Sequence, residues 1–173
     1  LLTRDAEQIE GGRDPVRLRR YPVALALNTA GIVEDRTLFE AAGINRRTAL
    51  AYERLLANLL VVDAVPAWTS NRLKRLVLSP KRYVIDPGLD AAVLGMDVDL
   101  VMRNGDYLGR LLDTFVAAEL RAALGVTDSR PRLFHVRQQQ GRCEVDLLAE
   151  LDGGRLVGRE IRATAAPTVE ERG

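Results

Sequence analysis

Three segments near the C-terminal side of the sequence alternate apolar and polar residues with the period of two that is typical of β-strands. They are RLFHVRQ (132–138), CEVDLLAEL (143–151) and RLVGREIRA (155–163), joined by turns at QQGR and Asp-Gly-Gly. If Asp-Gly-Gly is a three-residue hairpin loop, Leu151 opposes Arg155, and this fixes the register of the last two strands. Counting back along the strands then predicts that Asp146 faces Glu160.

Two carboxylates that oppose each other on a sheet are unfavourable, so the predicted Asp146–Glu160 pair requires a neutralising partner. A bound magnesium or manganese ion is one candidate, because hard divalent cations are held by one or two carboxylates and by water. The other candidate is Arg162, which the same register places opposite Glu144 and next to both acids. The sequence alone leaves both alternatives open.

A long helix is predicted just before these strands, from Asp106 to Leu124, with Gly125 placed to end it. Its predicted buried face consists of Leu108, Leu111, Leu112, Phe115, Val116 and Leu120. Asp113 adjoins this face, and Gly109, one turn earlier, leaves room for a close approach. We therefore expect Asp113 to point toward the element that the helix packs against. A solvated position on the flank of the helix is the alternative.

The first half of the sequence has the outline of a helix-turn-helix. Pro22 and Gly31 suit the two ends of one helix, and Asp35 can cap a second helix that stops at Gly43. Asn45 is a plausible cap for a third helix. The apolar stripe of this third helix consists of Tyr52, Leu55, Leu56, Leu59 and Leu60.

A wing is predicted after the third helix, because VVDAVPAW (61–68) and KRLVLS (74–79) are rich in β-forming residues and flank the polar turn TSNR. Asp86 then begins the short helix PGLDAAVLG, and DVDLVMRNG connects it to the second half. The predicted nucleic-acid-binding residues are Arg46, Arg47 and Arg54 on the third helix and Arg72, Lys74 and Arg75 on the wing. The alternative is a domain that packs against a neighbour with these cations solvated.

Composition narrows the classes of function. The formal net charge is only +1, so a nucleic-acid partner has to be bound by a local basic patch. One cysteine, Cys143, and one histidine, His135, cannot build a Cys/His zinc site; Cys143 is interpreted as a small core residue, and His135 as a packed or surface residue. A single cysteine excludes an intramolecular disulfide, which predicts a cytoplasmic protein, and no apolar run approaches the length needed to span a bilayer, so no membrane partner is expected. No G-x-x-x-x-G-K-[ST] loop is present for nucleotide phosphates.

A family resemblance is carried by GRLLDTFVAAEL, HVR, EVD and REIRA, taken in this order. The series resembles the PD-(D/E)XK fold of restriction endonucleases. Together with NRRTALAYERLLANLLVV and SPKRYVIDPGL upstream, it is similar to the C-terminal half of a large bacterial family of predicted AAA-type ATPases. In that family a nucleotide-binding module precedes a winged helix and a nuclease-like domain. The resemblance covers about residues 21 to 167.

The resemblance implies a catalytic set made of Asp113, Asp146, Glu160 and Arg162, with Asp146 and Glu160 as ligands of magnesium or manganese. Two of these positions depart from the family pattern. Asp113 stands where glutamate is usual, and Arg162 stands where lysine is usual. Because arginine stays protonated, it is a poor general base, so a degenerate nuclease site is expected.

These observations predict an α/β chain, α+β overall, with a winged helix-turn-helix followed by a restriction-endonuclease-like mixed sheet flanked by helices. The expected divisions are a linker (1–20), a winged-helix domain (21–95), a nuclease-like domain (96–167) and a tail (168–173). The expected function is nucleic-acid binding or assembly, with an active DNA nuclease and a protein–protein module as alternatives. The expected partners are double-stranded DNA, an N-terminal ATPase module that would bind ATP, and further copies of the chain.

Overall fold

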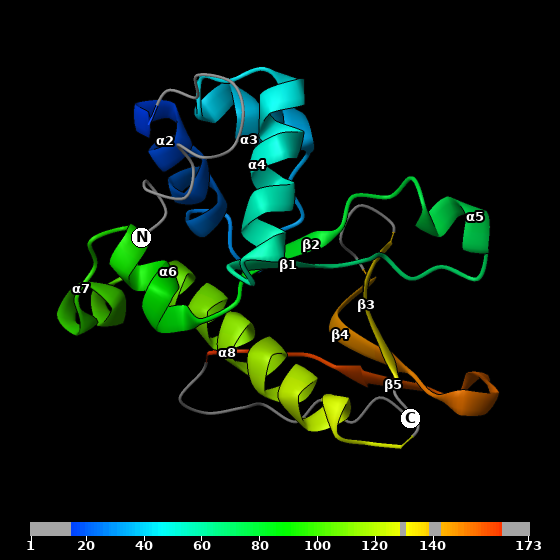
Figure 1. The fold of residues 1–173 in the computed structure, drawn as a ribbon. Helices are drawn as coiled ribbons and strands as arrows, with labels where there is room; N and C mark the ends of the chain where they lie inside the picture. Colours follow the sequence, from blue (N-terminus) through cyan, green and yellow to red (C-terminus); the bar gives the residue numbers. More distant parts are fainter. Residues whose placement is uncertain (1–14, 129–130, 139–142, 164–173) are drawn as a thin grey trace.

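The computed structural model describes residues 15–128, 131–138 and 143–163, and it begins with a group of three helices (Figure 1). These helices are α2 (Pro15–Ala26), α3 (Asp35–Ala41) and α4 (Arg46–Asn58). Tyr21, Leu38, Tyr52 and Leu56 are almost completely buried between them. The predicted apolar stripe of α4 is wrong at its end, because Leu59 and Leu60 follow the last helical residue and are exposed.

The predicted ends of these helices are correct in part. Asn45 caps α4 as predicted, since its side chain accepts a hydrogen bond from the backbone N–H of Thr48 at 2.9 Å. Gly43 follows α3 with a φ of +66°, the left-handed conformation that glycine adopts easily. The prediction for Pro22 is wrong, because α2 starts earlier and contains this proline. Asp35 is the first residue of α3 and not its cap, which is Glu34.

The wing is built differently from the predicted hairpin. Strand β1 (Val62–Val65) pairs in antiparallel fashion with β2 (Lys81–Val84). The predicted second strand, 74–79, is wrong, because Asn71 caps a short helix, α5 (Arg72–Arg75), by accepting hydrogen bonds from two backbone N–H groups. All four residues of β2 are buried. Its pairing with β1 and its burial therefore make this segment a strand, although its first two residues are charged.

Three further helices lead into the second half of the chain. Asp86 caps α6 (Pro87–Val93) as predicted, and the segment expected to be a connection contains α7 (Val98–Arg103). Helix α8 (Gly105–Gly125) matches the predicted long helix within two residues. Its predicted buried face is wrong at Phe115, whose exposed fraction is 49%. Within the described residues, no helix is both long and apolar enough to cross a membrane.

The three predicted C-terminal strands form an antiparallel sheet in the order β3 (Arg132–Gln138), β4 (Cys143–Glu150) and β5 (Leu156–Arg159). The predicted loop register is confirmed, because the backbone N–H of Leu151 donates to the carbonyl of Arg155 at 2.8 Å. Residues Asp152–Gly154 form the tight turn η2, in which both glycines have a φ of +77°. The side chain of Cys143 lies outside the described part of the chain.

The two halves of the chain share a core. Val65 and Tyr83 from the wing pack with Ala117 from α8 and Leu147 from β4. A parallel bridge between Ala67 and His135 also joins the segment after β1 to β3. Figure 1 shows α8 crossing between the helical group and the sheet. The α+β class is thus confirmed, and the contact between the halves creates the candidate site.

Candidate functional site

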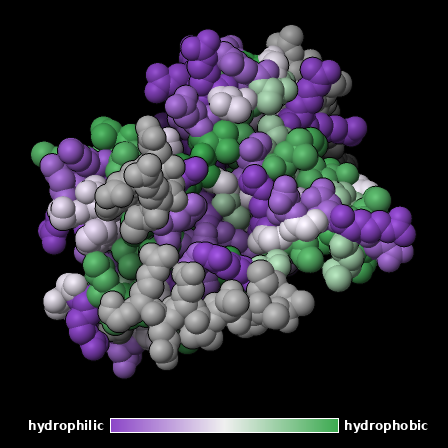
Figure 2. All heavy atoms as spheres, turned by 180° about the vertical axis from the view of Figure 1, so that it is seen from behind, coloured by the Kyte–Doolittle hydropathy of each residue, from purple (hydrophilic) through white to green (hydrophobic). Residues whose placement is uncertain are grey.

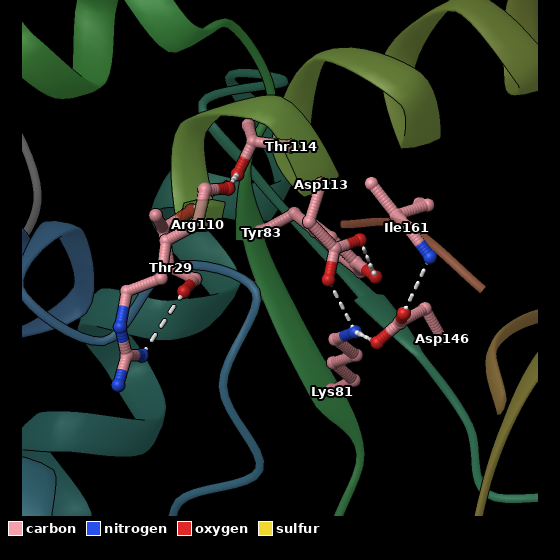
Figure 3. A network of polar contacts seen from close by, with 8 residues as sticks. All are labelled: Thr29, Lys81, Tyr83, Arg110, Asp113, Thr114, Asp146 and Ile161. Carbon is pink, nitrogen blue, oxygen red and sulfur yellow. Dashed lines mark hydrogen bonds and ion pairs between the residues drawn. The ribbon is translucent and has the colours of Figure 1, made fainter. Parts of the chain in front are cut away.

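Lys81, the first residue of β2, lies at the centre of a polar cluster where the two halves meet (Figure 3). Its side chain is only 3% exposed. The ammonium Nζ donates to Oδ2 of Asp113 on α8 at 2.5 Å and to Oδ1 of Asp146 on β4 at 2.8 Å. One lysine from the wing thus bridges two carboxylates from the second half.

The remaining carboxylate oxygens also have donors. The hydroxyl of Tyr83 donates to Oδ1 of Asp113 at 3.1 Å, and the backbone N–H of Ile161 donates to Oδ2 of Asp146 at 2.8 Å. We call this group, Lys81, Tyr83, Asp113, Asp146 and the Ile161 backbone, the Lys81 network. Buried charges are stable only with such a complete set of partners. All four carboxylate oxygens of the network are satisfied by the protein itself.

Burial dominates the electrostatics of the network. It raises the pKa of Asp113, and the nearby charge of Asp146 acts in the same direction, while the Lys81 ammonium opposes both. Burial and the Asp113 carboxylate raise the pKa of the Tyr83 hydroxyl far above its ordinary value. Tyr83 therefore stays protonated and can donate its hydrogen bond throughout the physiological pH range.

A second set of hydrogen bonds fixes the orientation of α8 next to the network (Figure 3). The hydroxyls of Thr29 and Thr114 are 3.0 Å apart, and the backbone N–H of Val84 donates to Thr29 Oγ1 at 3.1 Å. Arg110 donates from Nη1 to the carbonyl of Thr29 at 3.3 Å. These contacts hold the turn after α2, strand β2 and helix α8 together, so they position Asp113 toward Lys81.

A polar cavity of about 540 Å³ opens beside Asp113, between the turn after α2 and the sheet. Its charged lining residues are Asp106, Arg110, Asp113, Arg137 and Glu144. Gly109 also lines this cavity, and a Cβ atom added at that position would have no neighbouring heavy atom within 4 Å. The predicted role of Gly109, room for a close approach by Asp113, is therefore wrong, although Asp113 does point inward as predicted.

The predicted acidic pair does not form as expected. The ladder between β4 and β5 ends at Leu147 and Arg159, one position before Asp146 would face Glu160. Beyond that point Asp146 accepts the hydrogen bond from the backbone of Ile161, while Glu160 is exposed and forms an ion pair with Arg162 at 2.5 Å. The structure therefore brings together Asp113 and Asp146, and leaves Glu160 and Arg162 at the surface.

The network does not fit a divalent cation. The Lys81 ammonium already contacts both buried carboxylates, and the third predicted acid, Glu160, is engaged with Arg162. Among the described residues, no group of three or more His, Cys, Asp or Glu side chains is arranged to hold a metal ion. The network therefore supports no metal-dependent step, and the magnesium or manganese site stays a prediction.

The predicted nucleic-acid-binding residues separate into two groups. Arg46, Arg47 and Arg54 are exposed on α4, and Arg72 and Lys74 are exposed on α5. Arg75 points the other way, and its guanidinium lies 5.2 Å from the ring centroid of Trp68 and 5.0 Å from that of Phe134. Arg75 also contacts the Glu150 carboxylate at 3.2 Å, and Arg132 contacts the same carboxylate at 2.7 Å. We call these five residues the Arg75 clamp.

Lys81 and Tyr83 are the two side chains of the network to which the sequence alone assigned no role. The segment SPKRYVIDPGL carried the resemblance, but its Lys81 received no role because KRYV was not recognised as a strand. The usable signal was the spacing of Lys81 and Tyr83, which share one face of a strand and so can contact the same acid. His135, interpreted as a packing or surface residue, is buried, and its Nε2 lies 3.2 Å from the carbonyl of Ser79.

The fold and the site define an α+β protein with two parts. The helices α2 to α4 and the wing form the first part, and the Lys81 network joins it to α8 and the three-stranded sheet. Residues 1–100 match the family described as Domain of unknown function (DUF8612), and the chain belongs to this family. Residues 108–172 match a second family, described as Domain of unknown function (DUF4143). Lys81 thus lies within the first match, and both aspartates lie within the second.

Two curated relatives cover almost the whole chain. They are uncharacterized proteins of Mycobacterium bovis and Mycobacterium tuberculosis, each 34% identical over 169 residues, or 97% of this chain. The chain spans only 37% of the length of these relatives. No solved structure matches the chain.

Proposed function

We propose that this chain is a non-catalytic nucleic-acid-binding module on a nuclease-like scaffold. The observation that carries the non-catalytic part of the proposal is the position of the Lys81 ammonium between Asp113 and Asp146. In a metal-dependent nuclease, carboxylates of this kind hold a cation that activates water or stabilises charge on the phosphodiester. An ammonium balances the same negative charge, but it is no Lewis acid for this chemistry. The acids thus serve to join the two halves of the chain.

The helix-turn-helix supplies the proposed nucleic-acid-binding surface. Arg46 and Arg47 are exposed in the first turn of α4, which contains no acidic residue. The N-terminus of a helix carries partial positive charge, so these arginines and the helix end attract phosphate together. The Arg20 side chain approaches the turn at Gly43 and adds a further cation to this surface. Together these features support backbone contacts with duplex DNA.

The proposed setting is the C-terminal part of a longer ATPase-like protein. Two observations support it: the resemblance to the C-terminal half of predicted AAA-type ATPases, and the length of the curated relatives, of which the chain spans 37%. In this proposal, ATP is bound by a module outside the 173 residues. The nucleotide state of that module would then control when the helix-turn-helix engages DNA.

DNA binding is tested by fluorescence anisotropy with a labelled duplex over a series of salt concentrations. We expect the affinity to fall steeply as salt rises, and the double variant Arg46→Glu, Arg47→Glu to weaken binding by about tenfold or more. The matched control is Arg155→Glu, Arg159→Glu, which makes the same change in net charge at exposed positions around β5. Equal effects of the two double variants, or no binding by the wild type, would contradict the proposal.

The absence of catalysis is tested separately, with supercoiled plasmid in the presence of magnesium or manganese. We expect no cutting by the wild-type chain, by Asp146→Asn or by Arg162→Lys. Cutting by the wild type that Asp146→Asn abolishes would establish an active nuclease and overturn this part of the proposal. A gain of cutting in Arg162→Lys alone would instead identify Arg162 as the residue at which activity was lost.

A further inference from the structure

Helix α5 presents an apolar surface that nothing in the described structure covers. Leu73, in α5, is 77% exposed, and Leu76 and Val77, in the turn directly after α5, are both 81% exposed. Arg72 and Lys74 are exposed beside them. We call these five residues the α5 surface. Exposed apolar groups rimmed by charges are typical of protein interaction sites.

The α5 surface is held in place from its opposite side. Arg75 donates from Nε to the carbonyl of Thr69 at 2.6 Å, and its guanidinium belongs to the clamp on Glu150. The segment that joins α5 to β2 is held by the contact between His135 and the Ser79 carbonyl. Figure 1 shows α5 projecting from the body of the molecule. The clamp therefore turns the apolar side of α5 outward, away from the core.

Helix α7 presents a second apolar surface, with two acidic residues at its start that have the opposite charge to the α5 surface and the exposed Arg103 in its last turn. Val98 and Met102 are one turn apart and are 76% and 64% exposed, and Leu100 is half-exposed. Asp97 and Asp99 are exposed at the same helix. We call these five residues the α7 surface. In Figure 1, α5 and α7 lie at opposite ends of the molecule, and Figure 2 shows apolar side chains at both lateral margins beside hydrophilic ones.

We propose that the α5 surface of one copy of this chain binds the α7 surface of a second copy. The apolar side chains would cover one another, while Arg72 and Lys74 would face Asp97 and Asp99. Contact between two α5 surfaces would instead oppose like charges. Because the two surfaces are different and lie at opposite ends, the contact is head-to-tail, and it builds rings or filaments of more than two copies.

The test uses variants that block one surface each. Leu76→Glu blocks the α5 surface, and Met102→Lys blocks the α7 surface; both side chains are exposed, so the core is untouched. In sedimentation equilibrium, we expect the mass of the wild-type chain to rise with concentration beyond that of a dimer. Each variant alone stays at the 19.1 kDa of one chain. An equimolar mixture forms a complex of two chains and no larger species, because only one productive contact remains.

Three results would overturn the proposal: a monomeric wild type at every concentration, a mixture of the two variants that stays monomeric, or self-association of Met102→Lys alone, which would indicate contact between α5 surfaces. Circular dichroism shows whether each variant is folded. A charge exchange provides an independent check. Lys74→Glu and Asp99→Lys should each weaken association, and the chain that carries both should associate again in part, since the exchanged positions are again opposite in charge.

Discussion

Lys81 and Arg75, two basic residues of the first half of the chain, contact the second half in different ways. Lys81 is a compact charge buried between two carboxylates, whereas the planar guanidinium of Arg75 stacks near two aromatic rings at the edge of the sheet. Asp113 and Asp146 share one cation, whereas Glu150 has both Arg75 and Arg132. A buried cluster with a single cation depends completely on that cation, while a clamp with two cations tolerates the loss of one.

The largest expected effect is therefore that of Lys81→Met, which keeps the length of the side chain and removes its charge. Two buried carboxylates would then face each other without a cation, so the free energy of unfolding should fall by about 3–5 kcal/mol. Urea unfolding measures this change. Adding Asp113→Asn and Asp146→Asn to the variant should recover part of the loss, because no unpaired charge remains. A loss below about 1 kcal/mol would mean that the network contributes little to stability.

Asp90 is a further buried carboxylate, and its hydrogen-bond donor is a neutral hydroxyl instead of a cation. It is completely buried on α6 and accepts a hydrogen bond from the Tyr107 hydroxyl at 3.1 Å. Burial raises the pKa of Asp90 from 3.8 to about 6. The folded state therefore keeps this proton at pH values at which the unfolded chain has released it.

The consequence is a pH dependence of stability that Asp90→Asn should remove. Between pH 3.8 and about 6, the folded chain binds more protons at Asp90 than the unfolded chain, so the free energy of unfolding falls as pH rises through this window. The expected contribution is on the order of 3 kcal/mol. Thermal unfolding of both chains at several pH values measures it. Parallel pH profiles for the wild type and Asp90→Asn would contradict the assignment.

Some of the contacts in both halves of the chain could be predicted from the sequence, and others could not. The Asp-Gly-Gly loop allowed the register of β4 and β5 to be counted, and the Asn45 cap was evident, because both depend on neighbouring residues. Strand β2 was missed because it is buried on both faces and shows no alternation. Its pairing with the distant β1 makes it a strand. The resemblance identified Asp113 and Asp146, but only tertiary structure could reveal that Lys81 lies between them.

The Arg75 clamp predicts a smaller loss than the Lys81 network. Arg75→Ala removes two contacts between a cation and an aromatic ring and one ion pair, so we expect a loss of about 2 kcal/mol in the free energy of unfolding. The clamp holds the segment that contains α5. Amide hydrogen exchange in this segment, 69–79, should therefore also become faster. An unchanged exchange rate in this segment, despite a loss of stability, would show that other contacts hold α5.

The smallest effect is expected for Arg132→Ala, which removes the other cation from the same carboxylate. The Arg132 side chain is 67% exposed, so its ion pair with Glu150 is screened by water and salt. Arg75 remains to neutralise Glu150, and the midpoint of thermal unfolding should shift by less than about 2 °C. If Arg132→Ala instead cost as much as Arg75→Ala, the two arginines would act as one unit. The clamp would then depend on both of its cations, and its contrast with the Lys81 network would be lost.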